Sequence, residues 1–94
     1  MSVPELPELD GFLGVEVVLD TRGELVYMGK LVKIMDNFYE LTDADVHDTS
    51  TGRTSKELYI IDAKKFGVKK NRAHVLVRKV EIVSISRLAD VIEY

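Results

Sequence analysis

The sequence predicts a single small domain, mainly β, whose longest strand bends and closes a small sheet into a barrel. Three observations lead to this class. Val15, Val17 and Leu19 occupy alternate positions, as in a half-buried strand. Residues 24–47 form two long apolar-rich runs that break only at Asp36-Asn37, a pair typical of a turn. Gly29 interrupts the first of these runs, and a glycine inside a strand marks a bend or a close backbone approach.

A helix over residues 23–41 fits the same stretch less well. It would carry Gly29 in its interior, at a cost of about 1 kcal/mol relative to alanine. It would also contain many residues that prefer sheets. These are Val26, Tyr27, Val32, Ile34, Phe38 and Tyr39. We therefore take two strands, 24–35 and 38–47, as the frame of the domain.

The other elements follow in order along the chain. Leu6, Leu9, Phe12 and Leu13 follow a helical period and predict a short N-terminal helix that caps one end of the barrel. Residues 20–23 and 48–53 have turn and loop compositions. Residues 56–61 predict a strand, and residues 63–66 one helical turn ended by Gly67.

The last part of the chain completes the sheet. Residues 69–72 form a basic loop, and residues 74–78 and 80–85 predict two strands that meet near Lys79. Beyond them, Ser86 begins a helical turn or continues the strand.

Composition restricts the class of protein. The 94 residues suit one domain spanning 1–94, and 46% hydrophobic with 31% charged residues is typical of a folded globular chain. The absence of cysteine excludes disulfides and thiolate metal sites. The apolar runs are too short to span a bilayer, and the acidic N-terminus lacks the basic start of a signal peptide, so we expect a cytoplasmic protein without a membrane partner. No nucleophile elbow, phosphate loop or metalloprotease motif is present, so we expect neither an enzyme nor a cofactor.

Charge is distributed unevenly along the chain. Residues 1–48 hold 11 acidic and 3 basic residues, whereas residues 49–94 hold 5 acidic and 10 basic ones. This segregation predicts a basic face for an anionic partner, or opposite surfaces that meet within an oligomer. The candidate phosphate contacts are Lys64, Lys65, Lys69, Lys70 and Arg72. The same residues could instead form a solvated loop or protect an exposed strand edge.

Two further groups of polar residues are candidate sites. Asp43, Asp45 and His47 lie on one side of a predicted strand and, with Asp48, could hold a hard cation. A polar strand end accounts for them better, so the sequence predicts no metal. His74 has no catalytic partner nearby in sequence and is interpreted as a surface or interface histidine.

Two blocks of the sequence together resemble the Sm and Sm-like (LSm) proteins. The first comprises Gly14-Val15, Val17, Leu19, Gly23, Tyr27, Gly29, Leu31, Asp36, Phe38-Tyr39 and Leu41. The second is V-R-K-V-E-I-V-S-I at residues 77–85. The resemblance implies a strongly bent five-stranded barrel that pairs its fourth strand with the fifth strand of the next subunit. It implies a homo-oligomeric ring of five to seven subunits that binds single-stranded RNA. The segment at about 48–73 is an insertion relative to the family.

The resemblance also implies a binding pocket. Its base-stacking residues fall on Phe38 and Arg78, and its other positions on Asp36, Glu40 and Lys79. Stacking a base on a ring and a guanidinium is worth about 1–3 kcal/mol. The chain departs from the family pattern at Glu40 in place of an asparagine, Lys79 in place of a glycine, Val80 in place of a polar residue and Asp43 in place of an apolar one. An alternative places Phe38 in the core and pairs Arg78 with Glu40 or Asp36.

Two functions follow from this interpretation. The first is a ring that binds single-stranded RNA without catalysis, as a chaperone or scaffold of low base specificity. The second is a structural or protein-interaction ring that does not bind RNA. Glu40, Lys79, Val80 and the acidic pI of about 5.3 favour the second.

Overall fold

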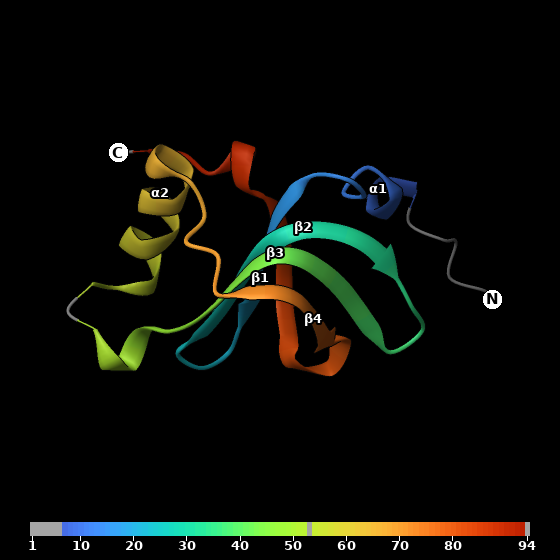
Figure 1. Ribbon diagram of the computed structural model, residues 1–94, viewed down its shortest axis with the longest axis horizontal. Coiled ribbons are helices and arrows are strands. Elements are labelled where there is room, and N and C mark those ends of the chain that lie inside the picture. The colour runs from blue at the N-terminus through green and yellow to red at the C-terminus, as the bar shows by residue number, and fades with distance from the viewer. Residues whose placement is uncertain (1–6, 53, 94) are drawn as a thin grey trace.

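The computed structural model describes residues 7–52 and 54–93 (Figure 1). The helices are α1 (Pro7–Asp10) and α2 (Lys56–Phe66), and three single 3-10 turns are η1 (Thr49–Thr51), η2 (Lys79–Glu81) and η3 (Leu88–Asp90). The strands are β1 (Glu16–Thr21), β2 (Leu25–Ile34), β3 (Phe38–Asp48), β4 (Arg72–Arg78) and β5 (Ile82–Arg87). Leu6, assigned to the N-terminal helix from the sequence, lies outside the described residues.

All five strands belong to one antiparallel sheet in the order β4-β3-β2-β1-β5. β2 and β3 are its longest members and curve together across the molecule (Figure 1). β4 and β5 are the two edges, and no register joins them within the described residues. The mainly β class with five strands is therefore confirmed, whereas closure of the sheet into a barrel stays a prediction.

Gly29 lies at a close approach of the β2 and β3 backbones. A Cβ atom at this glycine would lie 2.9 Å from both Cα and Cβ of Ala44 and 3.1 Å from the Thr42 carbonyl oxygen. The β2–β3 register also shifts between Met28 and Lys30. Opposite this irregularity, Asp43 has a φ angle of 50°, in the left-handed region that aspartate tolerates better than most residues. The predicted close backbone approach at Gly29 is confirmed.

Two clusters of buried side chains pack against opposite faces of the sheet. One contains Val17, Leu19, Leu31, Leu41, Ala44 and Val77. The other contains Val18, Val26, Met28, Ile60, Ala63 and Leu88. Because neighbouring residues of β1 point to opposite faces, Val17 and Val18 belong to different clusters. The strand predicted to be half-buried is therefore buried on both faces. α2 and η3 thus cover the sheet face that the first cluster does not use.

The predicted strand at 56–61 is wrong, because these residues form the first half of α2. The helix begins where the backbone N–H of Leu58 donates to the Ser55 hydroxyl, an N-cap that satisfies an otherwise unpaired donor. Glu57 in the first turn and two lysines in the last suit the helix dipole. Gly67, at φ 95°, ends the helix and donates its N–H to the Ala63 carbonyl. The single helical turn predicted at 63–66 is the end of this longer helix.

The remaining predictions, at the two ends of the chain and at the basic loop, are confirmed in part. The short N-terminal helix is present as α1, and Phe12 just after it packs against the first cluster. Arg72 begins β4 and does not belong to the basic loop predicted at 69–72. Ser86 continues β5, and the turn η3 follows it. No helix among the residues described is long and apolar enough to cross a membrane.

Candidate nucleic-acid interface

The structure brings the β2–β3 turn at Asp36-Asn37 next to the turn at Lys79 that follows β4, although the two turns are about 40 residues apart in the chain. Phe38, the first residue of β3, is the register partner of Arg78, the last residue of β4. One residue further, the backbone N–H of Lys79 donates to the Asn37 carbonyl at 2.9 Å. A phenyl ring and a guanidinium therefore leave neighbouring backbones at the same level of the sheet.

Both side chains are available to a ligand. Arg78 is exposed and Phe38 is half-buried, and Phe38 belongs to neither buried cluster. Within residues 7–52 and 54–93, Arg78 forms no ion pair within 4 Å. A ring and a guanidinium placed in this way can both stack on the flat face of a base.

Glu40 has a partner that the sequence did not predict. It lies two residues beyond Phe38, on the same side of β3, and its Oε2 atom is 3.1 Å from Nε2 of His74 on β4. The Glu40 side chain is 23% exposed and that of His74 is 54% exposed. This contact depends on the register of two strands separated by the insertion, which the sequence alone does not provide.

Lys79 and Asp36 lie at the edge of the same site. The Lys79 ammonium is 5.4 Å from the centroid of the Tyr39 ring, within the range of a cation–π contact. Asp36 is exposed in the β2–β3 turn, which is closed by a 2.8 Å hydrogen bond from the Met35 N–H to the Phe38 carbonyl. The five residues assigned to the pocket are therefore gathered around the end of one strand pair.

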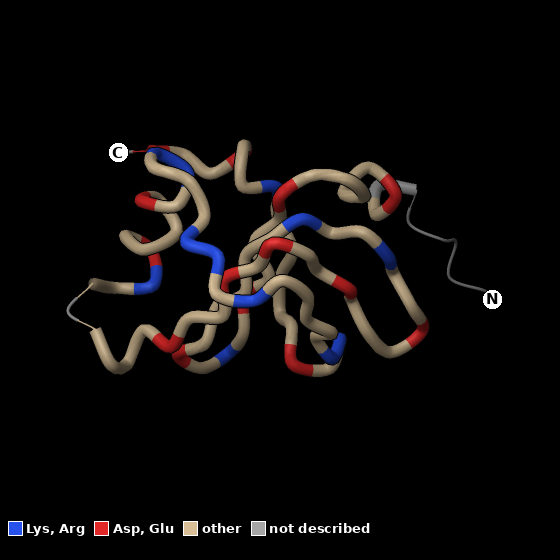
Figure 2. Tube along the Cα trace, viewed as in Figure 1, with Lys and Arg blue, Asp and Glu red and all other residues tan. Residues whose placement is uncertain are grey.

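The basic residues of the insertion lie elsewhere. Arg72 stands at the opposite end of β4 from Arg78, about 20 Å away along the strand. Lys64 donates to the Val91 carbonyl, and the ammonium of Lys65 is 3.9 Å from the Glu93 carboxylate. Basic positions follow α2, its connector and the start of β4, away from the β2–β3 turn (Figure 2). The structure does not add these residues to the Phe38–Arg78 site.

A second polar cluster, which the sequence did not predict, joins β3 to the insertion. Asp45 is 1% exposed and accepts hydrogen bonds from the Tyr59 hydroxyl and, at 3.0 Å, from the Asn71 side-chain amide. His47 stacks on Tyr59 with ring centroids 3.7 Å apart. Burial raises the pKa of Tyr59, and its hydrogen bond to Asp45 raises the pKa further. This cluster fixes α2 and the 67–71 connector to the sheet.

The cation hypothesis for Asp43, Asp45, His47 and Asp48 gains no support from their positions. Asp45 and His47 are engaged with Tyr59, and Asp43 is exposed at the strand irregularity. The Asp48 carboxylate accepts from the hydroxyl and the N–H of Ser50, and these hydrogen bonds lower its pKa. In the described part of the chain, no three such residues are grouped as ligands of one metal ion.

Comparison with solved structures finds Sm and Sm-like proteins that share the fold of this chain. One match is the structure of Pyrococcus abyssii Sm protein in complex with a uridine heptamer. Its sequence is 17% identical to this one, and the TM-score is 0.60 over 92% of this chain and 99% of that chain. An Sm-like protein from Archaeoglobus fulgidus is also 17% identical, with a TM-score of 0.58 over 93% of this chain and 96% of that one. No protein-family model matches the sequence. No curated protein matches it either. The structural neighbours of this chain are Sm and Sm-like proteins, and the chain has their fold.

Proposed function

We propose that this chain assembles into a homo-oligomeric Sm-like ring and binds single-stranded RNA without catalysis, as a chaperone or scaffold. Phe38 and Arg78 form the base platform, and Asp36, Glu40 and Lys79 line the pocket around it. The observation that carries the proposal is the register of Phe38 with Arg78, next to the hydrogen bond from the Lys79 N–H to the Asn37 carbonyl. The Sm-like fold, shared with a protein solved with a uridine heptamer, supports it.

The proposed ring would place several copies of the RNA-binding pocket side by side. Among the described residues, no strand pairs with the outer side of β4 or of β5, and an exposed edge is a template for another strand. Leu76 and Val83 on these strands are 44% and 52% exposed. Pairing β4 of one copy with β5 of the next would cover both edges and join five to seven copies into a ring.

The proposed pocket discriminates weakly between bases. Stacking on Phe38 and Arg78 uses the flat face that every base has, so it supplies affinity without sequence preference. Glu40 stands where an amide would read the base edge, and an ionised carboxylate can only accept hydrogen bonds. Its negative charge also opposes phosphates. We therefore expect binding that weakens steeply with salt and prefers no single base at this pocket.

Titration of fluorescently labelled oligo-U and oligo-A at two salt concentrations tests this pocket. Arg78→Ala should weaken binding of both strands about fivefold or more, the range expected for one stacking contact. Glu40→Asn should strengthen binding, because it removes a charge and adds a donor. Lys30→Ala, an exposed lysine in the middle of β2, removes one positive charge without touching the pocket and serves as the control. Tight, salt-insensitive binding selective for oligo-U would contradict the proposed pocket.

The Glu40–His74 contact favours a second function, a protein-interaction ring that does not bind RNA. It places a carboxylate and an imidazole, rather than a base-reading amide, on the face that carries Phe38. The same titration decides between the two. A wild-type chain that forms a ring but binds neither strand at low salt would favour the protein-interaction function over RNA binding.

A further inference from the structure

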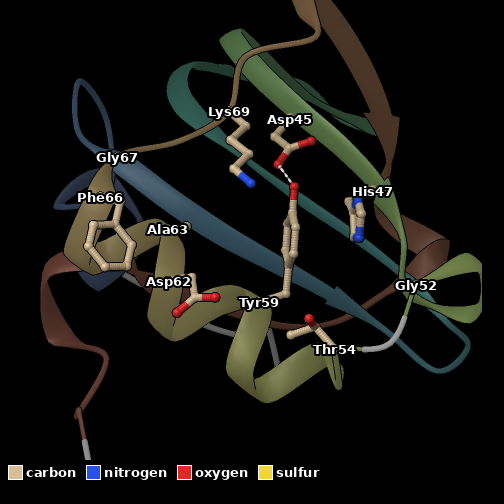
Figure 3. Close-up of a pocket in the computed structure, with 10 residues that line it drawn as sticks. All are labelled: Asp45, His47, Gly52, Thr54, Tyr59, Asp62, Ala63, Phe66, Gly67 and Lys69. Carbon is tan, nitrogen blue, oxygen red and sulfur yellow. Dashed lines mark hydrogen bonds between the residues drawn. The ribbon is translucent and has the colours of Figure 1, made fainter.

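A cavity of about 410 Å³ opens between β3 and the insertion, far from the Phe38–Arg78 site. Its lining includes Asp45, His47, Tyr59, Asp62, Phe66 and Lys69 (Figure 3). His47 lies nine residues after Phe38 on β3, about 30 Å along the strand. The volume is within the range of small-molecule sites in proteins.

One wall of this cavity is a preorganised aromatic surface. Tyr59 is fixed by the buried Asp45 at its hydroxyl and by the stacked His47 against one ring face. In Figure 3, Tyr59 stands in the middle of the lining, with His47 on one side and Asp62, Phe66 and Lys69 on the other. Tyr59, Asp62, Ala63 and Phe66 share one face of α2 because they follow the helical period. An aromatic side chain that is already held in place loses little conformational freedom on binding, so it is a favourable platform for a flat ligand.

Phe66 adds an exposed apolar surface that is not part of the packed core. It is 80% exposed, and it is absent from both groups of packed hydrophobic side chains. A phenylalanine at the mouth of a cavity can cover a planar ligand that lies against the aromatic wall.

The charged groups of the cavity restrict the ligand further. Asp62 and Lys69 are both exposed, and neither forms an ion pair within 4 Å in the residues that the structure describes. A carboxylate accepts hydrogen bonds from an amino group, whereas an ammonium attracts a phosphate. The cavity thus offers flat apolar surface, the carboxylate of Asp62 as an acceptor and the ammonium of Lys69 as a cation.

We propose that this cavity binds a nucleotide whose base carries an exocyclic amino group, either free or as part of a single strand. The base packs against Tyr59 and Phe66, Asp62 accepts from the amino group, and Lys69 neutralises the phosphate. Adenine and cytosine carry such an amino group, whereas uracil presents a carbonyl oxygen at the equivalent position. The proposal adds to the RNA-binding function a second site, which prefers bases with an amino group. Where the nucleotide belongs to a strand, the proposal rests on that function.

Calorimetric titration with AMP and UMP, followed by labelled oligo-A and oligo-U, tests the site. AMP should bind about fivefold or more tightly than UMP, and Phe66→Ala should weaken AMP binding by a similar factor, as expected for a lost stacking contact. Lys69→Ala should weaken AMP binding and reduce its salt dependence. Asp62→Asn should bring AMP and UMP closer in affinity. These three side chains are exposed, so the variants should keep the wild-type fold and melting temperature.

Two controls match these variants. Leu58→Ala truncates another exposed apolar residue of α2 outside the cavity, and Lys30→Ala removes one exposed charge on β2. Both should bind AMP as the wild type does. Binding of oligo-A without binding of AMP would identify the strand as the natural source of the nucleotide.

The proposal is overturned if neither AMP nor oligo-A binds at low salt, or if Phe66→Ala and Lys69→Ala bind both as the wild type does. Failure here is distinct from failure of the Phe38–Arg78 pocket. If Arg78→Ala abolishes RNA binding while the cavity variants have no effect, the cavity is not a nucleotide site and the proposed function stands. If the cavity binds AMP while Arg78→Ala leaves RNA binding unchanged, the cavity is a nucleotide site and the proposed Phe38–Arg78 pocket is wrong.

Discussion

Replacement of Gly29 by alanine should destabilise the domain strongly for so small a change. The new Cβ atom would lie 2.9 Å from Cα and Cβ of Ala44, whereas carbon atoms pack best at about 3.5–4.0 Å. The strands would have to separate by roughly 0.6 Å at a buried site. Overpacking of this kind costs about 1–3 kcal/mol. In a domain of this length the melting temperature should fall by about 5–20 °C.

Gly23→Ala is the matched control, because a Cβ atom there meets nothing within 4 Å. It should be neutral or slightly stabilising, since alanine restricts the unfolded chain more than glycine does. Adding Ala44→Gly to Gly29→Ala removes one of the two close carbon contacts and should recover part of the lost stability. Thermal unfolding followed by circular dichroism measures all four proteins. The proposed backbone approach is refuted if Gly29→Ala melts within about 2 °C of Gly23→Ala.

Two further stability predictions concern β3 and its partners. Tyr59→Phe leaves the buried Asp45 with one donor fewer and should lower the free energy of unfolding by about 1.5–3 kcal/mol, measured by urea unfolding at neutral pH. The folded-state pKa of Tyr59 is raised above its ordinary value of 10.0, so wild-type stability should fall as the pH rises above about 10. Tyr59→Phe should show a shallower fall, and equal slopes in the two proteins would argue against the buried hydrogen bond. Asp43→Val should cost about 1–2 kcal/mol because of the positive φ angle, whereas Asp43→Gly should cost little; equal melting temperatures would contradict this.

Local patterns predicted most of the sheet because strands leave a period-two signal in the sequence. The alternation of Val15, Val17 and Leu19 locates β1, although Val15 precedes the strand and is exposed and Val18 is also buried. The Asp36-Asn37 break separates β2 from β3. The close approach at Gly29 was also predictable, since a glycine in the interior of a long strand usually marks a bend or a neighbouring backbone. These features depend only on residues close together in the chain.

The prediction failed at α2 because local propensity and boundary signals disagree there. The run Leu58 to Ile61 contains two β-branched residues and a tyrosine, which favour strands. The correct signals were the Ser55 cap, two lysines in the last turn and Gly67 directly after it. Burial of Ile60 and Ala63 against the sheet then stabilises the helix, a tertiary effect that no window of sequence contains.

The candidate site was predictable only where it depends on residues close together in the sequence. The motifs identify Phe38 and Arg78, and the register of β3 with β4 places them side by side. The partners of Asp45 are 14 and 26 residues away in the chain, so its burial depends on where the insertion folds. The Glu40–His74 contact likewise joins two strands across that insertion.

The molecular mass of the wild-type chain in solution tests the central claim most directly. If the β4 and β5 edges pair between copies as proposed, size-exclusion chromatography with light scattering at micromolar concentration should give one species of five to seven copies of the 10.6 kDa chain. A single species at 10.6 kDa would show that these edges remain unpaired and would contradict the ring on which the proposed function depends.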